Sequence, residues 1–263
     1  MSGKPLIDEL FEDSELDNEI LKSFSAKDEL DSKIFKMSND TYKMDKTIRE
    51  KLLKISDTFI DFIGVDFFVH DVVLTGSLAN YNWSKFSDVD LHILVDMDEN
   101  GKSEKINNVA YHDLVKEFLD AKKNVWNKTH NIRIKGYDVE LYVQDVDEKH
   151  VSSGVFSILN NKWIIEPQKT KEFIDDRKII EKGEEFMKSI DRLVSASKSG
   201  KDVTTEIDTL KDKIKKFRQS GLEKGGEYSY ENLTFKLLRR NGYIEKIIRI
   251  KTDMIDKKLS ITQ

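Results

Sequence analysis

The stretch LTGSLANYNWSKFSDVDLHILVD, residues 74 to 96, constrains the fold more than any other part of the chain. An apolar run ends at Gly76 and Ser77, and after a loop a second apolar run contains Asp88 and Asp90. The alternation in DVDLHILVD predicts a half-buried strand with both carboxylates on one face. Because a carboxylate is costly to bury without a partner, these acids need a compensating charge. The pattern therefore predicts a metal ion beside them.

A third carboxylate belongs to a later strand. The segment NIRIKGYDVELYVQD predicts a hairpin that turns around Gly136, and its second strand places Asp138, Glu140 and Tyr142 on one face. Three acids at one sheet edge suit Mg²⁺ or Mn²⁺, because hard cations prefer oxygen ligands. Two such ions, about 3.5 to 4 Å apart, stabilise the attacking and leaving oxygens of an in-line phosphoryl displacement. The residues thus predict a metal-dependent transfer of the phosphoryl type.

Length and composition set the class of protein. The chain has 263 residues, 38% hydrophobic and 35% charged, which fits one large α/β domain or two smaller ones, with two favoured. No apolar run approaches the roughly 20 residues that span a bilayer. The absence of cysteine excludes disulfides and thiolate metal sites. The start MSGKP lacks a signal-peptide pattern, so we expect a cytoplasmic protein without membrane partners.

The net charge of −5 hides an asymmetry between the two ends of the chain. Residues 6–31 are rich in acids, and residues 211–249 carry a run of basic side chains: Lys211, Lys213, Lys215, Lys216, Arg218, Lys236, Arg239, Arg240, Lys246 and Arg249. Phosphate-bearing ligands respond to local potential more than to the total charge. The basic segment therefore indicates either a phosphate-binding surface or a solvated helix face.

Apolar spacing predicts the other elements. A helix should follow Asn39 or Asp40 as its cap and end at Gly64, and another should run over 103–125. In the second helix we expect an apolar stripe of Ile106, Val109, Ala110, Leu114, Phe118 and Val125. From residue 169 onward the pattern is helical, over 173–196, 203–218 and 230–256.

Domain limits follow from these elements. We place a boundary at the end of SSGVFSILNNKWIIEP, near Pro167. The expected organisation is an acidic N-terminal arm or short helix over 1–38, a catalytic domain over 39–167 and a helical domain over 168–263. No internal repeat is present.

Three motifs resemble the nucleotidyltransferase superfamily, which includes DNA polymerase beta, CCA-adding enzymes, oligoadenylate synthetases and aminoglycoside nucleotidyltransferases. Its pattern is an apolar residue before Gly-Ser, then Asp-x-Asp in an apolar strand and a distant acid between apolar residues. The matching segments are Leu74-Thr75-Gly76-Ser77, Asp88-Val89-Asp90-Leu91 and Val139-Glu140-Leu141. The resemblance implies an α/β (α+β) fold: a nucleotidyltransferase-type mixed sheet with flanking helices, followed by a helical C-terminal lobe.

The resemblance also implies a role for each residue. Asp88 and Asp90 would bind two Mg²⁺ or Mn²⁺ ions, and Glu140, with Asp138 as its rival, would bind the ion that activates the acceptor hydroxyl. Gly76 would let the backbone approach the triphosphate, and Ser77 would bond its terminal phosphates. Basic residues outside these motifs are candidates by their position and charge. Lys85 lies in the loop expected over the nucleotide, and four residues of the C-terminal half are candidates for contact with phosphates: Lys216, Lys236, Arg239 and Arg240.

The implied reaction moves a nucleoside monophosphate from a nucleoside triphosphate to a hydroxyl and releases pyrophosphate. An RNA end or a nucleotide is the favoured acceptor, and a protein hydroxyl or a small molecule stays open. The alternative is a catalytically silent module of the same fold that binds nucleotide or nucleic acid as a sensor or interaction partner. The segments SSGVFSILNNKWIIEP and GEYSYENLTFKLLRR also resemble parts of bacteriophage nucleotidyltransferase-like proteins, which implies a bacterial cell or a phage-infected host.

Overall fold

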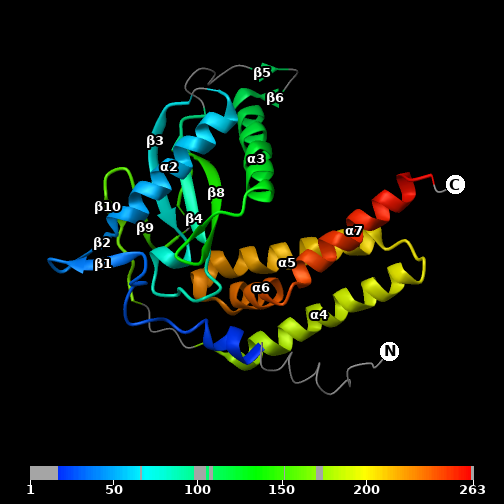
Figure 1. Ribbon diagram of the computed structural model, residues 1–263. Helices are drawn as coiled ribbons and strands as arrows, with labels where there is room; N and C mark the ends of the chain where they lie inside the picture. Colours follow the sequence, from blue (N-terminus) through cyan, green and yellow to red (C-terminus); the bar gives the residue numbers. More distant parts are fainter. Residues whose placement is uncertain are drawn as a thin grey trace, which may run out of the picture. The chain divides into compact units, whose positions relative to one another are not determined.

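The computed structural model describes residues 17–65, 67–97, 105–106, 109–150, 152–169 and 174–261 (Figure 1). The chain divides into two compact units. One, here the sheet unit, is Ala26–Thr170, and the other, the helical unit, joins Met1–Ser25 to Lys171–Gln263.

A mixed six-stranded sheet forms the centre of the sheet unit. Its strand order is β10 (Lys162–Ile165), β9 (Val155–Ser157), β3 (Val69–Thr75), β4 (Val89–Val95), β8 (Tyr137–Asp145) and β7 (Arg133–Ile134). Strands β4 and β8 pair in parallel, and the other neighbours pair antiparallel. The hairpin predicted around Gly136 is present as β7 and β8. Small strand pairs also form: β1 (Phe35–Ser38) with β2 (Thr41–Met44), and β5 (Lys105–Ile106) with β6 (Val109–Ala110).

Helix α2 (Lys46–Ile63) precedes the sheet and starts later than its predicted cap. The carboxylate of Asp45 accepts the backbone N–H groups of Thr47 and Ile48, so Asp45 is the N-cap. Asn39 and Asp40 instead form the β1–β2 turn, where both adopt positive φ (49° and 59°). Asn and Asp tolerate this left-handed conformation better than most residues, which is why the expected cap was wrong.

Helices α2 and α3 (Tyr111–Thr129) pack on one face of the sheet. Phe59 of α2 and Trp126 of α3 make an edge-to-face contact at 5.4 Å between ring centroids, inside a core that contains Leu74, Leu91 and Leu141. The apolar stripe predicted for a helix over 103–125 was wrong, because α3 begins only at Tyr111 and Ile106, Val109 and Ala110 lie in β5 and β6. Leu119 and Trp126 are the buried residues, whereas Phe118 and Val125 are 38% and 50% exposed. Neighbouring residues on a helix are rotated by about 100°, so an error of one position turns the wrong side inward.

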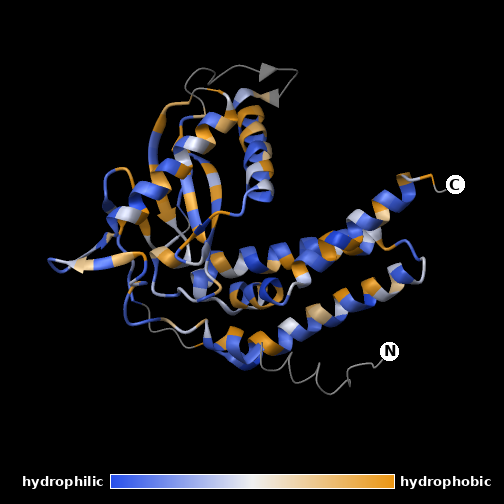
Figure 2. Ribbon diagram, in the orientation of Figure 1, coloured by the Kyte–Doolittle hydropathy of each residue, from blue (hydrophilic) through white to orange (hydrophobic). Residues whose placement is uncertain are grey.

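Among its described residues, the helical unit contains α4 (Asp176–Lys198), α5 (Thr204–Gly225), the short helix η2 (Gly226–Tyr228), α6 (Tyr230–Arg240), α7 (Tyr243–Leu259) and the helical residues 17–22. Figure 2 shows hydrophobic and hydrophilic residues side by side along the long helices, as amphipathic helices require. Its core contains Phe186, Ile190, Ile207, Leu238 and Ile247. The single helix predicted over 230–256 is broken at Gly242, whose φ is 72°. Of the helices in the described part of the chain, none is long and apolar enough to cross a bilayer.

Candidate active site

Strand register brings two of the predicted acids together. Asp90 of β4 is the direct parallel partner of Glu140 of β8, and Thr75 of β3 is the antiparallel partner of Asp90. Paired residues point to the same side of a sheet, so these three side chains share one face. The opposite face carries buried leucines from the same strands and packs on α2 and α3. Asp88 lies just before β4, and Asp88, Asp90 and Glu140 are all partly exposed.

The Gly76 backbone lies against the carboxylate of Asp90. Gly76 has φ of 69°, and a Cβ built there would lie 1.8 Å from Asp90 Oδ2. A side chain at this position would therefore be strained by the backbone and would collide with the carboxylate. This contact explains the spacing of the sequence motif, because the antiparallel pairing of β3 and β4 returns Asp90 to the end of β3.

Hydrogen bonds hold the turn after Gly76, the short helix η1 (Ser77–Ala79). Ser77 Oγ donates to Ser87 Oγ at 2.7 Å, which ties the turn to the residue before Asp88. Asn80 Nδ2 donates to the Gly76 carbonyl at 2.9 Å, and the Gly76 N–H donates to Ser152 Oγ at 3.3 Å. The predicted phosphate-binding turn is therefore braced from two sides.

Sequence reasoning missed part of this brace. Ser152, Ser153 and Gly154 stood out only as part of a segment near a domain boundary. In the structure Ser153 Oγ donates to Asn80 Oδ1 at 2.9 Å, and a Cβ on Gly154 would lie 2.1 Å from the Ala79 carbonyl oxygen. The Ser-Ser-Gly sequence was the available signal for this brace. Local sequence patterns do not show that it packs against a turn more than 70 residues earlier.

The two rivals for the third carboxylate differ in their surroundings. Tyr142 Oη donates to Glu140 Oε2 at 2.6 Å, so Glu140 is held on the face that carries Asp90. Asp138 pairs with Arg133 Nε at 2.6 Å, and both side chains are more than half exposed. This difference favours Glu140 as the third ligand, and its role stays a prediction.

The oxygen donors of this site fit a divalent cation whose coordination shell is completed by the substrate. Within the described residues, no group of three or more His, Asp or Glu side chains is arranged as a ready metal site. Mg²⁺ is usually held by one or two carboxylates together with substrate phosphates and water. The oxygen donors Asp88, Asp90 and Glu140, with Gly76 close to Asp90, match that kind of site better than a cage made by protein alone.

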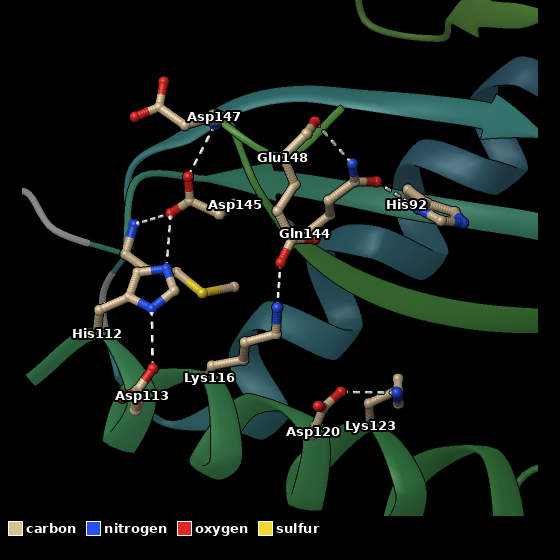
Figure 3. Close-up of polar contacts among 11 residues, drawn as sticks. His92, His112, Asp113, Lys116, Asp120, Lys123, Gln144, Asp145, Asp147 and Glu148 are labelled. Atoms are coloured by element: carbon tan, nitrogen blue, oxygen red, sulfur yellow. Dashed lines mark hydrogen bonds and ion pairs between the residues drawn. The ribbon is translucent and has the colours of Figure 1, made fainter. Parts of the chain in front are cut away.

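Another Asp-x-Asp segment in this unit, Asp145-Val146-Asp147, has a structural role, as Figure 3 shows. Asp145 ends β8 and is buried, and its carboxylate accepts the backbone N–H groups of Met97 and Asp147 at 2.9 and 2.8 Å. His112 Nε2 lies 3.8 Å from the same carboxylate. Asp145 thus fixes the far ends of β4 and β8, away from Asp90 and Glu140.

The predicted basic residues lie in both units. Lys85, in the loop before Asp88, is exposed, with its Nζ 5.0 Å from the centre of the Phe86 ring. Lys216 is exposed on α5, and Lys236, Arg239 and Arg240 all belong to α6. Arg240 is partly engaged within its own unit: its Nη1 donates to Ser23 Oγ at 2.5 Å and its guanidinium lies 5.0 Å from the Phe24 ring.

Comparison with known proteins decides the family. A model of the nucleotidyltransferase domain family matches residues 56–220, more than half of the chain. The chain belongs to the nucleotidyltransferase family. The match spans β3, β4 and β8 with Gly76, Asp88, Asp90 and Glu140, continues through α4 and includes most of α5. The mixed sheet and the helical C-terminal region agree with the nucleotidyltransferase fold.

Two further comparisons add little to this assignment. No curated protein matches the nucleotidyltransferase chain. Among solved structures, the STING-associated CdnE c-di-GMP synthase from Capnocytophaga granulosa is similar with 12% sequence identity, over 82% of this chain and 84% of that one, at a TM-score of 0.21. A likeness at this TM-score bears on neither the substrate nor the acceptor.

Proposed function

We propose that this nucleotidyltransferase moves a nucleoside monophosphate from a nucleoside triphosphate to a hydroxyl acceptor and releases pyrophosphate. The observation that carries the proposal is the pairing of Asp90 with Glu140, with the Gly76 backbone against Asp90. It places carboxylates beside a turn whose glycine admits the close approach of a phosphate chain. A family member with this arrangement is equipped for nucleotidyl transfer.

Each residue has a proposed task. Asp88 and Asp90 hold two Mg²⁺ or Mn²⁺ ions, and Glu140 adds a ligand on the acceptor side. Bound there, the ions lower the pKa of the attacking hydroxyl and balance charge on the leaving pyrophosphate. The Gly76 turn and Ser77 orient the terminal phosphates, which requires the Ser77 hydroxyl to turn from Ser87 toward the nucleotide. Lys85, in the loop between Ser77 and Asp88, is a further candidate for nucleotide contact.

An RNA end or a nucleotide is the proposed acceptor. Its support is the charge of the helical unit, where Lys216 on α5 and Lys236, Arg239 and Arg240 on α6 offer positive side chains for phosphates. Labelling of a protein hydroxyl or of a small molecule would contradict this part of the proposal. It would leave the proposed reaction type unchanged.

The test is a labelling assay with matched variants. The protein would be incubated with each α-labelled nucleoside triphosphate, Mg²⁺ or Mn²⁺, and total RNA or a nucleotide mixture. We expect labelled acceptor from the wild type and none from Asp90→Asn. Glu140→Gln should lose most turnover yet keep the thermal stabilisation by metal and nucleotide, because Asp88 and Asp90 remain.

The control for the third ligand is Asp138→Asn. Asp138 shares the strand with Glu140 but pairs with Arg133, so this variant should label acceptor as the wild type does. An inactive Asp138→Asn beside an active Glu140→Gln would assign the third ligand to Asp138. A wild type that binds nucleotide but labels nothing under any condition would favour a silent binding module.

A further inference from the structure

Tyr142 donates a short hydrogen bond to the proposed third metal ligand. The two side chains lie two positions apart on β8 and therefore share a face, and Tyr142 Oη lies 2.6 Å from Glu140 Oε2. Hydroxyl-to-carboxylate bonds of about 2.5 to 2.7 Å are in the strong, charge-assisted class. The bond therefore restricts the rotation of the Glu140 carboxylate before any ion binds.

The ring of Tyr142 is itself held by a neighbouring strand. His92 of β4 is its direct parallel partner, and the two rings stack with centroids 4.8 Å apart and planes at 29°. Lys123 of α3 lies on the ring as well, with its Nζ 5.3 Å from the centroid. Tyr142 is thus fixed by contacts from β4 and α3.

A chain of polar contacts fixes His92 in turn (Figure 3). His92 Nδ1 lies 2.8 Å from Gln144 Oε1, and Gln144 Nε2 donates to the Glu148 carbonyl at 3.1 Å. The Glu148 carboxylate forms an ion pair with Lys116 of α3. The side chain of Gln144 is buried, so its orientation is set by these two partners. This series of polar contacts joins the Glu140 side of the sheet to α3.

We infer that Tyr142 is a positioning residue that sets the metal affinity of Glu140 by fixing its carboxylate. The inference rests on the proposed function, since it takes Glu140 as a ligand. Residues that orient a ligand through a hydrogen bond change metal affinity by about 10- to 100-fold when they are removed. The hydroxyl of Tyr142 contacts the ligand and not the ion, so its loss should weaken metal binding without abolishing it.

The test measures Mn²⁺ binding directly, from the electron paramagnetic resonance signal of the free ion, and does not need the acceptor. Tyr142→Phe keeps the ring and its stacking on His92 and removes only the hydroxyl. We expect it to lower Mn²⁺ affinity about tenfold. In a Glu140→Gln background, Tyr142→Phe should not lower the Mn²⁺ affinity any further.

The matched control is Tyr243→Phe. Tyr243 Oη donates to Asp191 Oδ2 at 3.0 Å inside the helical unit, so this variant also loses a tyrosine–carboxylate bond. It should bind Mn²⁺ as the wild type does. A second variant, His92→Leu, keeps Tyr142 and Glu140 but removes the stacking ring, and should lower Mn²⁺ affinity severalfold.

The outcomes separate this inference from the proposed function. Wild-type Mn²⁺ affinity in folded Tyr142→Phe, with weakened binding in Glu140→Gln, would overturn the role of Tyr142 and leave the metal site standing. Wild-type affinity in Glu140→Gln would overturn the ligand role of Glu140 itself. An equal loss from Tyr142→Phe with and without Glu140 would show a general structural effect and would also overturn the inference. If Tyr142→Phe did not fold, an unchanged affinity in His92→Leu would overturn it.

Discussion

Asp90 lies directly opposite Glu140 across the parallel strands β4 and β8, although the two residues come from separate motifs in the sequence. On the other side, Asp90 contacts the Gly76 backbone at the end of β3. One aspartate thus joins the predicted phosphate-binding turn to the predicted third metal ligand.

Gly76→Ala should abolish nucleotidyl transfer. The new Cβ would collide with Asp90 Oδ2, and the positive φ adds strain of about 1 to 2 kcal/mol. We expect activity to fall by much more than this loss of stability alone would cause, because Asp90 must move. Measurements of activity and of urea unfolding on the same preparation test this prediction.

Gly64→Ala is the control for Gly76→Ala. Gly64 has a similar φ, 75°, at the end of α2, but nothing lies within 4 Å of a Cβ there. It should lose a similar amount of backbone stability and keep its activity. Equal activity losses in the two variants would contradict the role of the Gly76–Asp90 contact.

Asn80→Ala should raise the KM for the nucleoside triphosphate more than it lowers kcat. Asn80 is buried and donates to the Gly76 carbonyl and to Ser152 Oγ, so its loss releases the turn that is proposed to hold the phosphates. The loss of these buried hydrogen bonds should also cost about 1 to 3 kcal/mol of stability. Steady-state kinetics over a range of nucleotide concentrations give the split.

Asn160→Ala provides a comparison for this effect. Asn160 Nδ2 donates to Asp71 Oδ2 and Ser157 Oγ, elsewhere in the sheet unit. This variant should lose stability with an unchanged KM. A KM that rises equally in both variants would mean that general loosening of the sheet unit, and not the turn, sets nucleotide affinity.

Tyr137→Phe should destabilise the sheet unit in a pH-dependent way. Tyr137 Oη donates to Asp31 Oδ2 at 2.6 Å, and both residues are buried. The variant leaves this carboxylate oxygen without its tyrosine donor, which should lower the free energy of unfolding by about 1 to 3 kcal/mol. Burial first, and then the bond to Asp31, raise the pKa of Tyr137 above its ordinary value of 10.0.

The sign of the pH effect follows from this raised pKa. The folded state keeps the phenol proton to higher pH than the unfolded chain, so the stabilisation is complete below about pH 10 and declines as pH rises further. Urea unfolding from pH 8 to 11 should show a constant difference between wild type and variant up to about pH 10, and a smaller one above it. A difference that grows with pH would contradict the assignment.

Arg239→Ala and Arg240→Ala should differ in their effects. Arg239 is exposed, so its removal should cost little stability and should weaken RNA binding. The log-log dependence of RNA affinity on salt should flatten by about 0.7 for each single-strand phosphate that the variant no longer neutralises. Arg240 also contacts Ser23 and Phe24, so its removal should lower the stability of the helical unit as well. An unchanged salt dependence in both variants would remove the support for RNA.

The sheet could be predicted from sequence because its signals are local. Period-two alternation located β4, and Gly136 located the β7–β8 turn. The family resemblance chose Asp88, Asp90 and Glu140 as a set, and the register confirms that Asp90 and Glu140 are neighbours, while metal binding by them stays a prediction. The fold class was also confirmed, since the mixed sheet and the later helices are both present.

The errors and omissions come from competing or non-local effects. The cap of α2 was misplaced because Asn39 and Asp40 suit a hairpin turn as well as a helix start. The brace from Ser152 to Gly76 was missed because it depends on how a distant loop packs. The bond from Tyr142 to Glu140 was within reach, since both were placed on one strand face, but a shared face does not reveal which side chains bond.

The most direct test of the central claim compares labels on two positions of the nucleoside triphosphate. Nucleotidyl transfer attaches the α-phosphate to the acceptor and releases the β- and γ-phosphates as pyrophosphate. With Mg²⁺ and RNA or a nucleotide acceptor, we predict that an α-label appears in the acceptor, that a γ-label appears only in pyrophosphate, and that Asp90→Asn abolishes both products. Transfer of the γ-label to the acceptor, or undiminished transfer by Asp90→Asn, would contradict the account.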